Sequence, residues 1–225
     1  MRTCEPALQD VIEEEARQEE MPLFAAVTPE EKPSEVKEFV ASALLESLPP
    51  RYRAAVEQAV MLFRFLENKP GVSFSPVFTT LLGSIDEAAK GLLARRLEPD
   101  LPPRSPDQQR WFEPHYGKAD SRRYQPVAQN LKKTLVYRNG ISPLGLLRTC
   151  MDYALNDNTK LDGVFAAIKQ KFQVKGGRDL LGAVTEINDF RNAYVAHQEK
   201  ELTDVRLTEK HLQKWINGLS AVASA

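Results

Sequence analysis

Residues 180–198 read LLGAVTEINDFRNAYVAHQ, and this stretch decides how the second half of the chain is interpreted. At about 100° per residue it forms one amphipathic helix, whose apolar side consists of Leu180, Ala183, Val184, Ile187, Phe190, Tyr194 and Val195. Arg191 falls near the centre of that side, and His197 falls at its flank. A guanidinium cannot lose its charge, and burying it unpaired costs several kcal/mol. We therefore expect an anion, a water-filled cleft or a second chain on this face.

Two interpretations of Arg191 and His197 are open. In the functional one, the arginine binds an anion and the histidine transfers protons near neutral pH. In the structural one, the arginine pairs with a carboxylate, and the histidine interacts with the dipole at the end of the helix. Glu186 and Asp189 lie away from Arg191 around the helix, so we expect both to be solvated.

The segment Arg191-Asn192-Ala193-Tyr194-Val195-Ala196-His197 resembles the signature of the HEPN superfamily, in which an arginine and usually a polar residue precede a histidine. The resemblance covers roughly residues 124–222. It implies a small four- or five-helix bundle in which two protomers face each other and form one metal-independent RNA-cutting site. It also implies catalytic roles for Arg191, Asn192 and His197, and products that end in a 2′,3′-cyclic phosphate and a 5′-hydroxyl.

Spacing alone does not single out this pair. All three histidines follow an arginine at an acceptable distance, as Arg110 with His115, Arg206 with His211, and Arg191 with His197. Pro114 interrupts the first pair, so one helix is not expected to hold it. A helix start at Thr208 separates the second pair, and Leu207 stands where the family prefers a polar residue. Only the third pair lies within a long periodic helix.

These residue types suit the cleavage of RNA by its own 2′-hydroxyl. A histidine with a pKa of ~6.5 can perform the proton transfers, and an arginine can clamp the phosphate through two hydrogen bonds. Asn192 would orient either group or contact a ribose. We expect RNA and a second copy of the chain as partners, with an antitoxin or another defence protein as a further one, in stress response or phage defence. No cofactor is expected.

Two other functions stay open. The first is a noncatalytic HEPN-like module that binds RNA or protein within a larger defence or nucleic-acid-processing assembly. The second is a helical adaptor in which Arg191 is satisfied within its own chain.

Composition favours a protein of the reducing cytoplasm. The chain has 225 residues, of which 42% are hydrophobic, enough for an ordinary core. No apolar run is long enough to span a bilayer, and the first 20 residues do not have the pattern of a signal peptide. The two cysteines, Cys4 and Cys150, are far apart, which argues against a disulfide framework. With three dispersed histidines they make no convincing zinc pattern.

The net charge of −1 hides a division along the chain. Residues 1–50 contain 4 Lys and Arg against 12 Asp and Glu, whereas the remainder contains 26 against 19. A basic body suits a polyanion, and an acidic arm could compete for it. The same asymmetry also serves simply to keep a surface soluble.

Residues 1–33 form the acidic arm and its linker, and three apolar stripes predict a helical N-terminal unit over residues 34–97. Five prolines between residues 98 and 123 indicate a linker without helices, which is the best candidate boundary. Within it, Trp111 and Phe112 either anchor the chain to a helix surface or stack on bases.

Residues 124–225 predict consecutive helices joined by short loops. They cover about 124–138, 143–155, a segment opening at Asn158 or Thr159, the motif helix, and a last helix after Thr208. Ser142 and Pro143 give the second of these a normal N-cap followed by proline. Because strand-like alternation is absent, we expect an all-α protein whose C-terminal part is an up-and-down, HEPN-like bundle.

Overall fold

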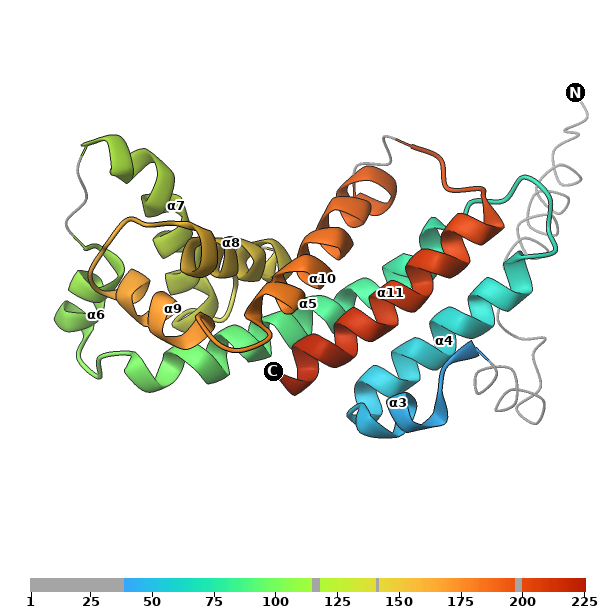
Figure 1. Cartoon of the computed structure of the whole chain (residues 1–225), viewed down its shortest axis with the longest axis horizontal. Coiled ribbons are helices and arrows are strands. Elements are labelled where there is room, and N and C mark those ends of the chain that lie inside the picture. Colours follow the sequence, from blue (N-terminus) through green and yellow to red (C-terminus); the bar gives the residue numbers. More distant parts are fainter. Residues whose placement is uncertain (1–38, 115–117, 141, 197–199) are drawn as a thin grey trace, which may run out of the picture. The chain divides into compact units, whose positions relative to one another are not determined.

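The computed structural model describes residues 39–114, 118–140, 142–196 and 200–225, without the side chains of 118–121 (Figure 1). The regular structure of these residues is helical and includes no strand, which confirms the expected all-α class. None of the helices described is long and apolar enough to cross a membrane. The expected acidic arm (1–33), His115 and His197 lie outside the described residues.

The expected N-terminal unit contains three described helices, α3 (Ser42–Ser47), α4 (Pro50–Leu66) and α5 (Ser75–Leu97). Pro50 and Pro76 lie in the first turns of α4 and α5, where proline costs no intrahelical hydrogen bond. The predicted apolar stripe of α5 is confirmed, because its buried residues are Val77, Phe78, Leu81, Ile85, Ala88, Ala89, Leu92, Leu93 and Leu97.

The segment expected to be a linker without helices is largely helical, so that expectation was wrong. It contains the 3₁₀ turn η1 (Glu98–Asp100), helix α6 (Ser105–Phe112) and the first residues of α7 (Lys118–Leu135). Pro99 and Pro106 lie in the first turns of η1 and α6, where proline starts a helix rather than breaking one. Phe112 is buried and Trp111 packs against the core, so this pair anchors the segment.

The second half continues with α8 (Pro143–Asn156), α9 (Val164–Phe172), α10 (Gly177–Phe190), η2 (Arg191–Ala196) and α11 (Val205–Ser224). Two predicted helix starts were wrong. Helix α9 begins at Val164, because Thr159 and its neighbours form a hydrogen-bonded loop instead. Helix α11 begins at Val205, because the Asp204 carboxylate caps it by accepting the Leu207 N–H at 2.9 Å.

Helix α5 belongs to the core of both expected units. It packs against α4 and α11, and also against α8 and α9 of the second half (Figure 1). Phe78 of α5 lies 4.7 Å from the ring of Phe190 and 5.0 Å from that of Trp215, measured between centroids. Residues 36–225 accordingly form one compact unit rather than an N-terminal unit, a linker and a separate bundle. A 23-residue helix, about 34 Å long at 1.5 Å per residue, has room for neighbours along its whole length.

Candidate functional site

The predicted motif helix changes its geometry at Arg191. Helix α10 is an α-helix as far as Phe190, and Arg191–Ala196 continue as the π-helical turn η2. The wider turn leaves backbone groups for outside partners: the Ser75 hydroxyl of α5 donates to the Tyr194 carbonyl at 2.9 Å. Such turns are rare and occur frequently at functional sites.

The apolar side of the predicted helix is confirmed at its centre. Val184, Ile187 and Phe190 are buried, whereas Leu180, Ala183, Tyr194 and Val195 are half-buried. The Phe190 ring lies in an aromatic cluster with residues of α5 and α11. This face therefore holds α10 against α5 and α11.

The half-buried side chain of Arg191 points to the start of α8. Its Nη1 donates to the Ser142 hydroxyl at 2.8 Å, and its buried Nε has no hydrogen-bond partner among the described residues. In this part of the chain no carboxylate forms an ion pair with it. No ion pair among the described residues therefore balances the positive charge of this guanidinium.

Glu186 and Asp189 do not take the place of that missing carboxylate, but neither is simply solvated as predicted. Glu186 forms an ion pair with Lys214 of α11, and Asp189 pairs with Arg148 of α8 at 3.1 Å. Their side chains stay 42% and 59% exposed, so each pair contributes little to stability. The two acids project to either side of α10 and join it to both neighbouring helices.

The remaining predicted site residues are placed only in part. Asn192 is half-buried in η2, next to Arg191. His197 lies outside the described residues, so the predicted meeting of the arginine and the histidine stays a prediction.

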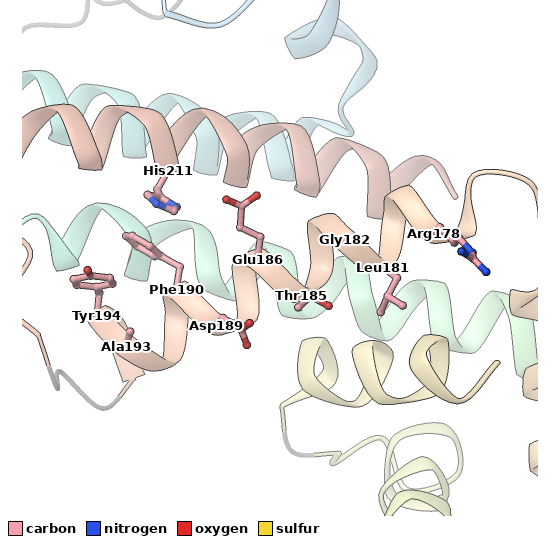
Figure 2. A pocket seen from close by; sticks show the side chains of 10 residues that line it. All are labelled: Arg178, Leu181, Gly182, Thr185, Glu186, Asp189, Phe190, Ala193, Tyr194 and His211. Carbon is pink, nitrogen blue, oxygen red and sulfur yellow. The ribbon is translucent and has the colours of Figure 1, made fainter. Parts of the chain in front are cut away.

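An open groove of about 690 Å³ runs along α10 and past α11 (Figure 2). Its lining includes Leu181, Gly182, Thr185, Glu186, Phe190, Tyr194 and His211, but not Arg191. His211 stacks on Phe190, with ring centroids 4.1 Å apart, and its buried Nδ1 has no partner among the described residues. Burial lowers the pKa of His211, and the nearby positive charge of Lys214 lowers it further.

The predicted helix start at Thr208, which would have separated His211 from Arg206, was wrong. With α11 starting at Val205, Arg206 and His211 lie in one helix. Arg206 is exposed, however, and only His211 faces the groove. Asp204 is of a residue type typical of an N-cap, and it was the signal in the sequence that marked the true start of α11.

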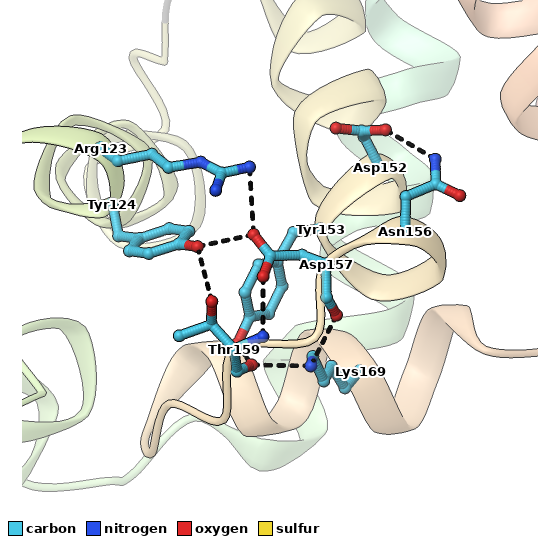
Figure 3. A network of polar contacts seen from close by, with 8 residues as sticks. All are labelled: Arg123, Tyr124, Asp152, Tyr153, Asn156, Asp157, Thr159 and Lys169. Carbon is cyan, nitrogen blue, oxygen red and sulfur yellow. Dashed lines mark hydrogen bonds and ion pairs between the residues drawn. The ribbon is translucent and has the colours of Figure 1, made fainter. Parts of the chain in front are cut away.

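A second polar cluster fastens the loop between α8 and α9 (Figure 3). The Asp157 carboxylate accepts from the Tyr124 hydroxyl at 2.6 Å and from the Thr159 N–H at 2.8 Å, and it pairs with Arg123 at 3.1 Å. Lys169 donates to the carbonyls of Asp157 and Thr159. The cluster joins α7, the loop and α9, which makes it a structural device.

Comparison with protein-family models, with curated proteins and with solved structures finds no match. Nowhere in the described part of the chain do three His, Cys, Asp or Glu side chains gather in a way that could hold a metal ion.

Proposed function

We propose that this chain is a metal-independent endoribonuclease of HEPN type that cleaves RNA by attack of the 2′-hydroxyl on the adjacent phosphate. The observation that carries the proposal is the state of Arg191. A half-buried guanidinium that contacts a neutral hydroxyl, with no carboxylate partner among the described residues, retains its charge for an anion. The all-helical fold and the π-helical turn that begins at this arginine also support the proposal.

In the proposed reaction, His197 of one protomer removes the proton from the 2′-hydroxyl, whose oxygen then forms a bond to phosphorus. The 5′-oxygen leaves and takes a proton from the second protomer's histidine. Arg191 binds the non-bridging phosphate oxygens, where negative charge is concentrated. Asn192 orients these groups or contacts the ribose. The products carry a 2′,3′-cyclic phosphate and a 5′-hydroxyl, so all atoms of the RNA are retained.

One motif supplies one arginine and one histidine, so the composite site requires two copies of the chain. We accordingly propose a homodimer that acts in the cytoplasm, in stress response or phage defence, with an antitoxin or another defence protein as regulator. The solution mass tests the dimer, and a strict monomer at micromolar concentration contradicts the composite site.

The test is the cleavage of 5′-labelled single-stranded RNA by the purified full chain in EDTA, with analysis of the product ends. Wild type is expected to yield cyclic phosphates, and His197→Ala is expected to abolish cutting. Arg191→Lys keeps the charge but loses the planar fork, so we expect a loss of about a hundredfold, in the range seen for removal of a transition-state donor.

Arg206→Ala is the matched control, because Arg206 is exposed on α11 and outside the groove lining. It is expected to cut as wild type does. RNA that stays intact with wild type under varied activators refutes the proposal, as does equal cutting by His197→Ala.

A noncatalytic binding module is the second candidate, and the groove on α10 is the observation that favours it. A Cβ at Gly182 would meet no atom within 4 Å, so a larger side chain at this groove-lining position begins in open space. Under this candidate, Gly182→Tyr weakens binding of the RNA or protein partner, and His197→Ala leaves binding unchanged.

A further inference from the structure

Ser142 occupies the N-cap position of α8 as predicted, but its side chain does not cap the helix, so the expectation of a normal N-cap was wrong. Its backbone is left-handed, with φ 49° and ψ 67°, and its side chain makes no capping hydrogen bond. Serine rarely adopts this conformation, and at an N-cap its oxygen normally accepts from the first turn. Here the hydroxyl instead accepts from Arg191, 49 residues away in sequence, at 2.8 Å.

A side chain of α5 caps the first turn of α8 instead. Asp86 of α5 accepts the N–H of Leu144 at 3.0 Å, so this N–H in the first turn of α8 has an acceptor without the Ser142 side chain. The carboxylate of Asp86 is not within ion-pair distance of Arg191, whose charge it therefore does not neutralise. This arrangement leaves the serine hydroxyl available to Arg191.

The surrounding helices also make room for this contact. A Cβ at position 145 would lie 3.1 Å from the Ser142 Oγ and 3.6 Å from the Asn188 Oδ1. Glycine at that position thus allows the hydroxyl to lie between α8 and the end of α10. An unusual backbone conformation persists only where its surroundings determine it, and such residues cluster at functional sites.

We propose that Ser142 is a positioning residue, which holds Nη1 of Arg191 and so fixes the orientation in which the guanidinium binds the RNA phosphate. This inference rests on the proposed nuclease function. A neutral acceptor is what such a task requires, because a carboxylate at the same place would fix the arginine equally well but cancel its charge. Ser142 acts through Arg191 and does not itself touch the substrate.

Three substitutions at this one position separate positioning from a merely structural role. Ser142→Gly removes the hydroxyl but suits a positive φ and is tolerated at an N-cap. Ser142→Asn also tolerates the left-handed region and keeps a neutral acceptor oxygen. Ser142→Asp fits the same backbone but places a negative charge beside Arg191.

The experiment measures kcat and KM for RNA cleavage, together with the urea midpoint of unfolding. We expect Ser142→Gly to lower kcat about tenfold, less than the roughly hundredfold that a 1 Å misplacement of a catalytic group can cost, at an unchanged or higher urea midpoint. Ser142→Asn should restore at least half of the wild-type kcat. Ser142→Asp should lose more activity than Ser142→Gly and raise KM, because the phosphate then meets a neutralised arginine.

The failures of the two proposals differ in their results. If wild type cuts RNA and Ser142→Gly cuts equally well, the positioning role is overturned while the nuclease proposal stands. If the loss in Ser142→Gly follows a lower urea midpoint, or Ser142→Asp is as active as wild type, the positioning role is likewise overturned. If wild type cuts no RNA, the nuclease proposal fails, and the role of Ser142 in it fails as well.

Discussion

Asp157→Asn offers the most direct test of how this fold is held together. The Asp157 side chain is only 6% exposed, and it accepts hydrogen bonds from Tyr124 and Thr159 beside the positive charge of Arg123 (Figure 3). Burial by itself raises the pKa of this carboxyl. The hydrogen bonds from Tyr124 and Thr159, together with Arg123, outweigh burial and lower the pKa from 3.8 to about 2.

The expected contribution of Asp157 to the free energy of unfolding follows from the difference between these two pKa values. At about 1.36 kcal/mol per pKa unit, it corresponds to about 2.4 kcal/mol. Arg123 is 65% exposed, so solvent screens its share, and we expect about 1.5 kcal/mol. A carboxyl with a lowered pKa stabilises the fold fully above its unfolded-state pKa of 3.8, and this stability is lost as the pH falls through about 2.

The assay is urea unfolding followed by circular dichroism between pH 7 and pH 3. Asp157→Asn is expected to be less stable than wild type at pH 7. The difference between their free energies of unfolding should fall by about half at pH 3. Asp152→Asn is the matched control, because this carboxylate on α8 is exposed and accepts from Asn156. Its cost should stay within about 0.5 kcal/mol. A gap that is the same at pH 7 and pH 3, or an equal cost for the control, refutes the reasoning.

Four further substitutions test packing and protonation. Gly163→Ala should lower the free energy of unfolding, measured in urea, by about 2 kcal/mol or more. The reason is that φ at this position is +61° and the new Cβ would lie 2.3 Å from the Trp111 carbonyl oxygen. Unchanged stability contradicts this. Gly218→Ala should destabilise the contact between α11 and α10, because the new Cβ would lie 2.3 Å from Cδ1 of Ile187, which is buried and has no open space to move into. A Cβ at Gly83 would meet no atom within 4 Å, so Gly83→Ala should stabilise α5 by about 0.5–1 kcal/mol. Thermal melts that rank the two variants in the opposite order argue against this reasoning. Burial lowers the pKa of His211, so the folded protein disfavours the charged imidazole and should lose stability as the pH falls below about 6.5. His211→Phe should remove this part of the loss. Identical pH profiles of the urea midpoints of variant and wild type count against it.

Local sequence patterns determined the helices and most of their buried faces. The spacing of apolar residues predicted where α4 and α5 run, and Ser142 followed by Pro143 predicted the start of α8. Apolar spacing also predicted that Val184, Ile187 and Phe190 face the core. These features depend on residues within a turn or two of each other, and such interactions can be derived from the order of residues alone.

Only the tertiary structure decided which elements meet. The apolar stripe of α5 predicted burial, but not that α4, α8 and α11 would all share it. The partners of Glu186, Asp189 and Arg191 lie on other helices, so no helical wheel of the motif segment contains them. A pattern along one helix specifies a face by its angle, whereas a polar contact also requires the position of the neighbouring helix, which the packing of the whole core fixes.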